Sequence, residues 1–191
     1  MFGGGGYPAS GAPGHLNDLW RYNSTTNMWV YQSGTSLVNQ FGNNGTLGVP
    51  STTNNPGGRY SAHQIFDNWG NLWLFGGIGY PGTSGIGRLN DLWRYTPGTD
   101  EWTWMKGFNG INPNGNYGTM GVSSPTNNPG GRYYNIGWKD TNGDMWVFGS
   151  FAFPATGPIA NINDMWKFNM TCAPFDITDA FSTNICNGDS T

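Results

Sequence analysis

Few side chains in this 191-residue sequence could do acid–base or metal chemistry. There are two histidines, and neither is kept by the repeat of the sequence described below: His15, which we expect in a loop before a strand, and His63. The segment 140–144 reads Asp-Thr-Asn-Gly-Asp, which matches the acidic spacing of a calcium loop but lacks the downstream glutamate. The alternative, a hairpin turn built on Asn-Gly, fits it better. The sequence therefore predicts no catalytic residue, no metal and no cofactor.

Two cysteines, Cys172 and Cys186, lie in the last twenty residues. A disulfide across this short loop would stabilise the fold by about 3 kcal/mol and would indicate an oxidising compartment. Two unrelated thiols are the alternative.

The tryptophans fall into two groups. Most recur in a repeated pattern, which indicates packing. Three do not recur as tryptophan, and they are candidates for stacking on a ligand such as a sugar, with ordinary packing as the alternative: Trp69, Trp104 and Trp138.

The elements that position these residues follow an internal repeat. The segment 16–22 (LNDLWRY) returns at 89–95 and, as INDMWKF, at 162–168, with a spacing of 73 residues each time. The segment 54–60 (NNPGGRY) returns at 127–133 with the same period. Each copy thus repeats one structural unit.

Each copy contains four strand candidates, separated by segments rich in glycine and asparagine. In the second copy they cover residues 60–66, 72–75, 91–95 and 101–105. The second of these strands is apolar at consecutive positions, so both of its faces must be covered.

This pattern resembles the kelch family, in which an apolar strand ends in Gly-Gly and is followed by a strand ending in Tyr and by a Trp seven residues later. The second copy carries Phe75, Gly76, Gly77, Tyr95 and Trp102. The first copy carries Phe2, Gly3, Gly4, Tyr22 and Trp29. The third copy departs from it with Ser150, Phe168 and Phe175. The resemblance implies an all-β fold of four-stranded antiparallel β-propeller blades.

The phase of the repeat predicts about two and a half blades, forming an incomplete ring. Residues 1–34 would be a partial blade with strands two to four. Residues 35–107 would be a long loop and a full blade, and 108–170 a long loop and most of a third blade. The tail 171–191 resembles the start of an immunoglobulin-like module. We expect the ring to be completed by missing blades of the same chain or by self-association.

Several repeated residues are predicted to be structural. We expect Arg59 and Arg132 to pair with the repeated aspartates between blades. The residues predicted to be structural are Asp18, Asp91, Asp164, Trp20, Trp93, Trp166, Arg59, Arg132, Gly76 and Gly77.

In four antiparallel strands, the connections from strand two to three and from strand four to one lie on the same face of the molecule, and both are long here. Long loops in compact domains often carry function. Positions that differ between copies on that face are expected ligand contacts, with Phe41 and Asn44 opposed to Asn114 and Tyr117. Tyr80, in the loop after the second strand, is a further expected contact.

The net charge of −3 and the scattered basic residues argue against nucleic acid. No apolar run approaches the roughly 18–20 residues that cross a bilayer, so we expect no membrane insertion. The galactose-oxidase type of propeller chemistry needs a Tyr–Cys crosslink and two His ligands, and here both cysteines lie in the tail. We therefore expect a non-catalytic module of a secreted or cell-surface protein that binds a protein or a glycan. The alternatives are a structural spacer in a surface array and a catalytic propeller.

Overall fold

The computed structural model describes residues 1–83 and 85–170. These residues form twelve strands and no helix, which confirms the all-β prediction. It follows that the described part of the chain has no helix able to cross a membrane. The tail 171–191, with Cys172, Cys186 and the position expected for a last strand of the third copy, lies outside the described residues.

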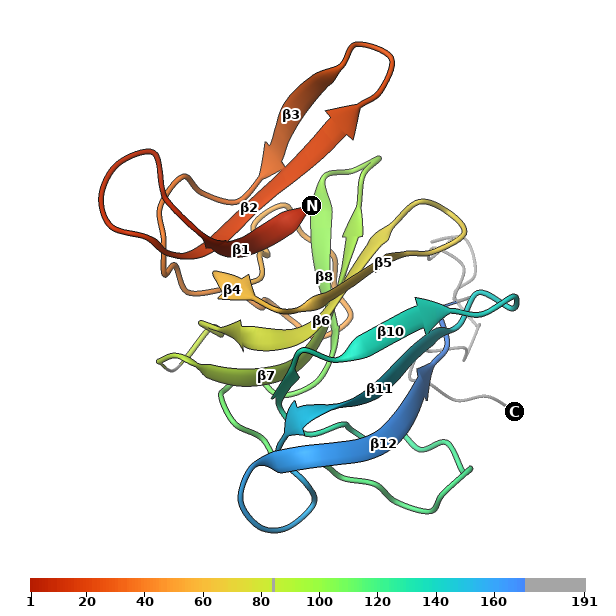
Figure 1. Ribbon diagram of the computed structural model, residues 1–191. Coiled ribbons are helices and arrows are strands. Elements are labelled where there is room, and N and C mark those ends of the chain that lie inside the picture. Colours follow the sequence, from red (N-terminus) through yellow and green to blue (C-terminus); the bar gives the residue numbers. More distant parts are fainter. Residues whose placement is uncertain (84, 171–191) are drawn as a thin grey trace.

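The strands group into three blades, one for each copy of the repeat (Figure 1). The first blade contains β1 (Phe2–Gly6), β2 (Gly14–Asn23) and β3 (Met28–Ser33). The second blade contains β4 (Arg59–Tyr60), β5 (His63–Phe66), β6 (Leu72–Gly79), β7 (Gly87–Thr96) and β8 (Glu101–Lys106). The third blade contains β9 (Arg132–Tyr133), β10 (Ile136–Lys139), β11 (Met145–Ala152) and β12 (Ala160–Phe168).

Within the second blade the strands pair in the order β5-β6-β7-β8, and every pair is antiparallel. The first and third blades repeat parts of this order, as β1-β2-β3 and β10-β11-β12. The short strand β9 bonds to β11 of its own blade and also to β7, which joins the second and third blades into one curled sheet of nine strands. The result is an incomplete propeller of antiparallel blades.

The first strand of the repeat differs from the prediction, because it is broken in two. Strand β4 is separated from β5 by Ser61, whose φ is +55°, and β9 is separated from β10 by Tyr134, whose φ is +57°. These conformations are uncommon for residues with a side chain. The turn at Ser61 lets β4 pair with the end of β6 while β5 pairs with the start of β6. The turn at Tyr134 does the same for β9 and β10 along β11.

Strand β6 is covered on both faces, as its apolar sequence predicts. Leu72 and Leu74 pack into a cluster shared with Phe2 and Leu19 of the first blade. Trp73 and Phe75 point the other way, into a cluster shared with the third blade. All four β6 residues are buried. Each such side chain contributes roughly 1.5–3 kcal/mol when it leaves water.

The periodic tryptophans are buried in the second blade but not throughout the chain. Trp73, Trp93 and Trp102 are among the largest fully buried side chains. Trp29, which the repeat places at the same position as Trp102, is 55% exposed. The repeat predicts packing for Trp29, and no described residue covers this position, because the first blade has a neighbour on one face only.

The repeated arginines pair with the repeated aspartates, but within one blade. Arg59 donates to both carboxylate oxygens of Asp91, at 2.6 and 2.8 Å, and Arg132 does the same to Asp164, at 2.8 and 2.7 Å. The expectation of pairing between blades is wrong because the broken first strand brings the arginine over β7 or β12 of its own blade. A removed partner would leave a buried charge, at a cost of about 3–5 kcal/mol.

Candidate aromatic site on the loop face

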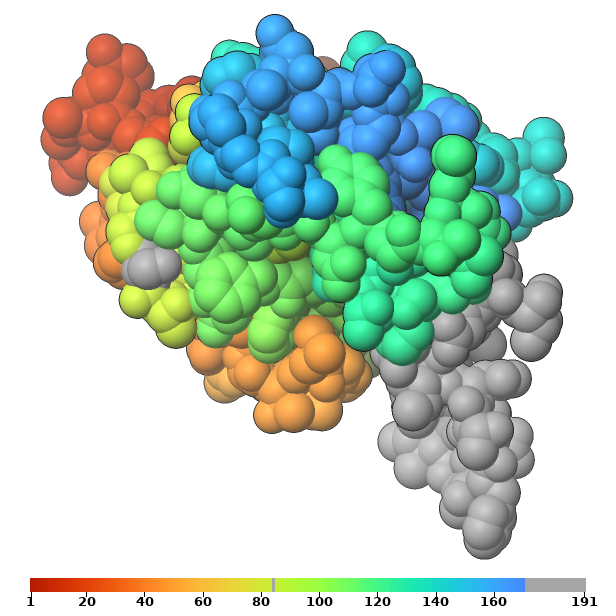
Figure 2. Space-filling model, turned by 90° about the horizontal axis from the view of Figure 1, so that it is seen from below, coloured from red at the N-terminus to blue at the C-terminus, as the bar shows by residue number. Residues whose placement is uncertain are grey.

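The long connections leave and re-enter the blades at one end, although the middle of the first of them runs along β8, where Gly48 and Ser51 donate to Trp104 and Trp102. The long connections are the segments 34–58, 80–86, 107–131 and 153–159. Figure 2 shows this face, with the loop 107–131 in green beside the hairpin of the third blade in blue and the loop 34–58 in orange. The opposite end carries short turns. We call the end with the long connections the loop face.

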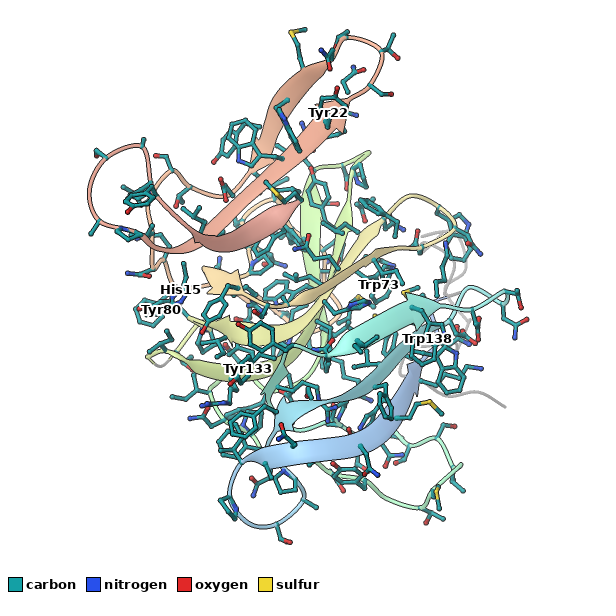
Figure 3. The ribbon with its side chains drawn as sticks, viewed as in Figure 1. His15, Tyr22, Trp73, Tyr80, Tyr133 and Trp138 are labelled. Carbon is teal, nitrogen blue, oxygen red and sulfur yellow. The ribbon has the colours of Figure 1, made fainter. Side chains whose placement is uncertain are left out.

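On this face four rings from two strands and two loops pack together. His15 of β2 stacks on Tyr60 of β4, with ring centroids 4.9 Å apart and planes 8° from parallel. Tyr80, which follows β6, tilts against His15 at 5.7 Å, and Phe41 meets Tyr80 edge-on at 5.5 Å. Figure 3 shows His15 and Tyr80 side by side at the rim of the blades. We call His15, Phe41, Tyr60 and Tyr80 the His15 cluster.

The His15 cluster is partly open to solvent, and desolvation disfavours a charge on its imidazole. Phe41 is 52% exposed, and His15, Tyr60 and Tyr80 are half-buried. Desolvation lowers the pKa of His15, and contact with Asn39 offsets this only in part. Its Nδ1 has no hydrogen-bond partner among the described residues. The His15 ring stacked on tyrosine therefore offers mainly apolar surface, because its unpartnered Nδ1 is buried.

The next blade junction has a different group at the same position. Arg88 replaces His15, and its guanidinium lies 5.4 Å from the centroid of Tyr133, 5.7 Å from Phe151 and 6.0 Å from Phe153. A cation over several rings is a favourable arrangement that the chain supplies to itself. The position of Phe41 is taken there by Asn114, so this second cluster has no protruding ring.

A polar hollow of about 310 Å³ lies beside the first blade. Amide and hydroxyl side chains make up most of its lining: Asn17, Tyr31, Ser33, Gly34, Thr35, Thr52, Asn54 and Asn55. The corresponding positions of the next copy hold the bulkier Trp104, Lys106 and Phe108. The hollow therefore reflects small side chains in the first copy.

The residues predicted to contact a ligand on the loop face do not form one site in the structure. Phe41 and Tyr80 meet, and Asn114 is exposed on the loop 107–131. Asn44 is only 4% exposed, and neither atom of its amide has a hydrogen-bond partner in the described structure. Tyr117 donates to Asp164 at 2.8 Å and packs on Trp166. Burial and this hydrogen bond raise the pKa of Tyr117 to about 12.

The three non-periodic tryptophans do not converge. Trp69 lies in the short turn between β5 and β6, at the opposite end from the loop face. Trp104 is half-buried in β8 and packs on the cluster between the first and second blades. Trp138 of β10 stacks on Trp146 with planes 2° from parallel. None of them joins the His15 cluster.

The segment 140–144 is a hairpin turn, as the sequence indicates. The Oδ1 of Asp140 accepts hydrogen bonds from the backbone of Asn142 and Asp144, and its Oδ2 accepts one from Trp146. Asp67 makes the same bonds in the second blade. No three His, Cys, Asp or Glu side chains gather into a metal site in residues 1–83 and 85–170.

Sequence reasoning missed His15 and Tyr60 as parts of one site, and it placed His15 in a loop when it lies in β2. A signal was present: Tyr60 recurs as Tyr133, and Tyr80 recurs as the aromatic Phe153. Comparison with models of known families and with curated proteins finds no match for this chain.

Proposed function

We propose that this chain is a non-catalytic binding module, built from kelch-type propeller blades, of a secreted or cell-surface protein. Its ligand is a protein or a glycan held on the loop face. The observation that carries this proposal is the His15 cluster, where Phe41 protrudes from a supported stack of rings.

The cluster has the properties of a recognition surface. Its rings are held by one another and by strands, so little conformational freedom is lost on binding. An aromatic body with polar groups around it suits either a sugar ring or an apolar side chain of a partner. The second junction lacks this opening, because Arg88 covers its own rings.

A structural spacer is the second candidate, and the regularity of the long loops favours it. The bridge between Asn43 and Asn55 recurs between Asn116 and Asn128, and Gly45 and Gly118 share φ values of +60° and +56°. Part of each loop is thus a fixed cover over the blade.

The experiment is a printed array of oligosaccharides, together with a displayed peptide library for protein ligands, probed with the wild type, Phe41→Ala and Phe66→Ala. Phe66 is a matched control, because it is 55% exposed but lies at the opposite end. A ligand that binds the wild type and Phe66→Ala, and binds Phe41→Ala about two- to tenfold more weakly, supports the proposal, since one aromatic contact contributes about 0.5–1.5 kcal/mol. Absence of any ligand in both formats favours the spacer.

A further inference from the structure

The first blade exposes an aromatic face on its side away from the second blade. We call Trp20, Tyr22, Trp29 and Tyr31, on β2 and β3, the first-blade face. Trp20 contacts Tyr31 and Tyr22 contacts Trp29, each with centroids 5.3 Å apart. Tyr22, Trp29 and Tyr31 are 46%, 55% and 48% exposed. Three exposed rings side by side make an apolar patch, which on a soluble protein marks an interaction site.

The repeat shows what this face is when it is covered. In the second blade the equivalents of Tyr22 and Trp29 are Tyr95 and Trp102, which are 3% and 1% exposed. They are covered by Phe2 and Leu19 of the first blade, and Phe2 meets Trp102 edge-to-face at 5.3 Å. The same kind of surface is therefore buried inside the chain and open at its first blade.

The surface that does the covering, formed by Phe2 and Leu19 in the first blade, has an exposed counterpart in the third blade. The equivalents of Phe2 and Leu19 in the second blade, Phe75 and Leu92, pack on the third blade. Their equivalents in the third blade are Phe148 and Met165, which are 43% and 57% exposed. With Ile136 and Trp138, which are 67% and 41% exposed, we call them the third-blade face. Figure 3 shows Tyr22 and Trp138 on well-separated blades.

We propose that the third-blade face of a second copy of this chain docks on the first-blade face. The two open faces are the two halves of a contact that the chain already builds twice, between its first and second blades and between its second and third. Residue types and positions on both halves repeat those of the internal contacts, so a copy arriving head-to-tail continues the existing stack.

This contact joins two different surfaces, so a pair of chains still has one first-blade face and one third-blade face open. Such heterologous contacts continue into closed rings or open chains and do not stop at a pair. The twist between successive blades favours closure into a ring. The occupant is a copy of the same chain because its third-blade face carries Phe148 and Met165 at the positions of Phe2 and Leu19, which cover Tyr95 and Trp102.

The test uses complementary variants in sedimentation velocity at about 1 µM to about 100 µM, the range of weak to moderate contacts. Trp29→Glu removes the first-blade face and Met165→Glu removes the third-blade face. We expect the wild type to grow in mass with concentration and each variant alone to remain a single chain. An equal mixture of the two should form a pair and nothing larger, because each variant keeps the face that the other lacks.

The control is Trp69→Glu, which changes a tryptophan that is 50% exposed but belongs to neither face, and it should behave as the wild type. Near-ultraviolet circular dichroism checks that each variant is folded, and Tyr22→Glu provides a second variant of the first-blade face. A wild type that stays a single chain at every concentration overturns the proposal. So does a Met165→Glu variant that assembles as well as the wild type, because the first-blade face would then be pairing with itself.

Discussion

His63 is a titratable group enclosed at the junction of the second and third blades. Its imidazole lies so close to Gly137 that a Cβ at that glycine would be 2.4 Å from Nε2. Nε2 is buried and has no hydrogen-bond partner among residues 1–83 and 85–170. Desolvation lowers the pKa of His63, so the folded protein favours the neutral ring. Opposite this ring only glycine leaves enough space.

Because the pKa is lowered on folding, the unfolded chain takes up a proton at His63 first as the pH falls. Stability is unaffected well above the unfolded pKa of about 6.5 and decreases below it. We expect His63→Ile, which introduces the residue found at the equivalent Ile136, to reduce the loss of unfolding free energy between pH 7.5 and pH 5.5. Urea unfolding at the two pH values measures this. His15→Asn, which changes the other histidine, should reduce the loss less, and an unchanged loss in His63→Ile would contradict the argument.

Strand β6 changes direction where it carries Gly76 and Gly77, and the bulge re-aims the chain so that β4 can pair with its end. Their φ values are +65° and +95°, and the pairing with β7 shifts register there. A Cβ on Gly77 would approach the carbonyl oxygen of Tyr60 to 2.7 Å. The third blade makes the same bulge with Gly149 and Ser150, and Ser150 has φ +126°. A conformation that suits glycine is thus held by a residue with a side chain.

We expect Ser150→Gly to stabilise the protein by about 1 kcal/mol, because an unfavourable backbone conformation costs on the order of 1–3 kcal/mol and glycine's greater freedom in the unfolded chain offsets part of the gain. The reverse change, Gly77→Ser, should destabilise the protein by more than about 1 kcal/mol, because the new Cβ also crowds the carbonyl oxygen of Tyr60. Urea unfolding of both variants measures the two effects. A destabilised Ser150→Gly would show that the serine hydroxyl contributes more than the backbone strain costs.

The period of 73 residues was enough to predict the four strands and the covered faces of β6, because burial on both sides follows from consecutive apolar residues. It could not predict the break at Ser61 or Tyr134, since neither residue type favours a positive φ and the conformation comes from closure onto β6 or β11. The same break decides that Arg59 meets Asp91 of its own blade. Phe41 was predicted from its variation between copies and Tyr80 from its place on the loop face, but His15 needed the fold, because His15 and Tyr60 lie 45 residues apart in sequence.

At the scale of the molecule, each blade owes its stability to its neighbours as well as to its own strands. The second blade is enclosed by two apolar clusters, one shared with each adjacent blade. In the first blade, Met28 to Tyr31 of β3 are all exposed, whereas the equivalent Glu101 to Trp104 of β8 are buried or half-buried. In stacked repeats, stability is approximately a sum of unit and nearest-neighbour contributions. The middle unit should therefore be the last to open.

Hydrogen exchange tests this order strand by strand. At low concentration we expect the amides of β7 to exchange at least about tenfold more slowly than those of the equivalent β2, and β3 to exchange fastest of the long strands, because local opening follows the buried contacts that it breaks. The two strands have the same sequence pattern, so the difference isolates what neighbouring blades contribute. Equal protection in β2 and β7 at low concentration would mean that the first blade is stable without a second neighbour. If β2 gains protection as concentration rises, and Trp29→Glu abolishes that gain, the first-blade face is the surface that a second copy covers.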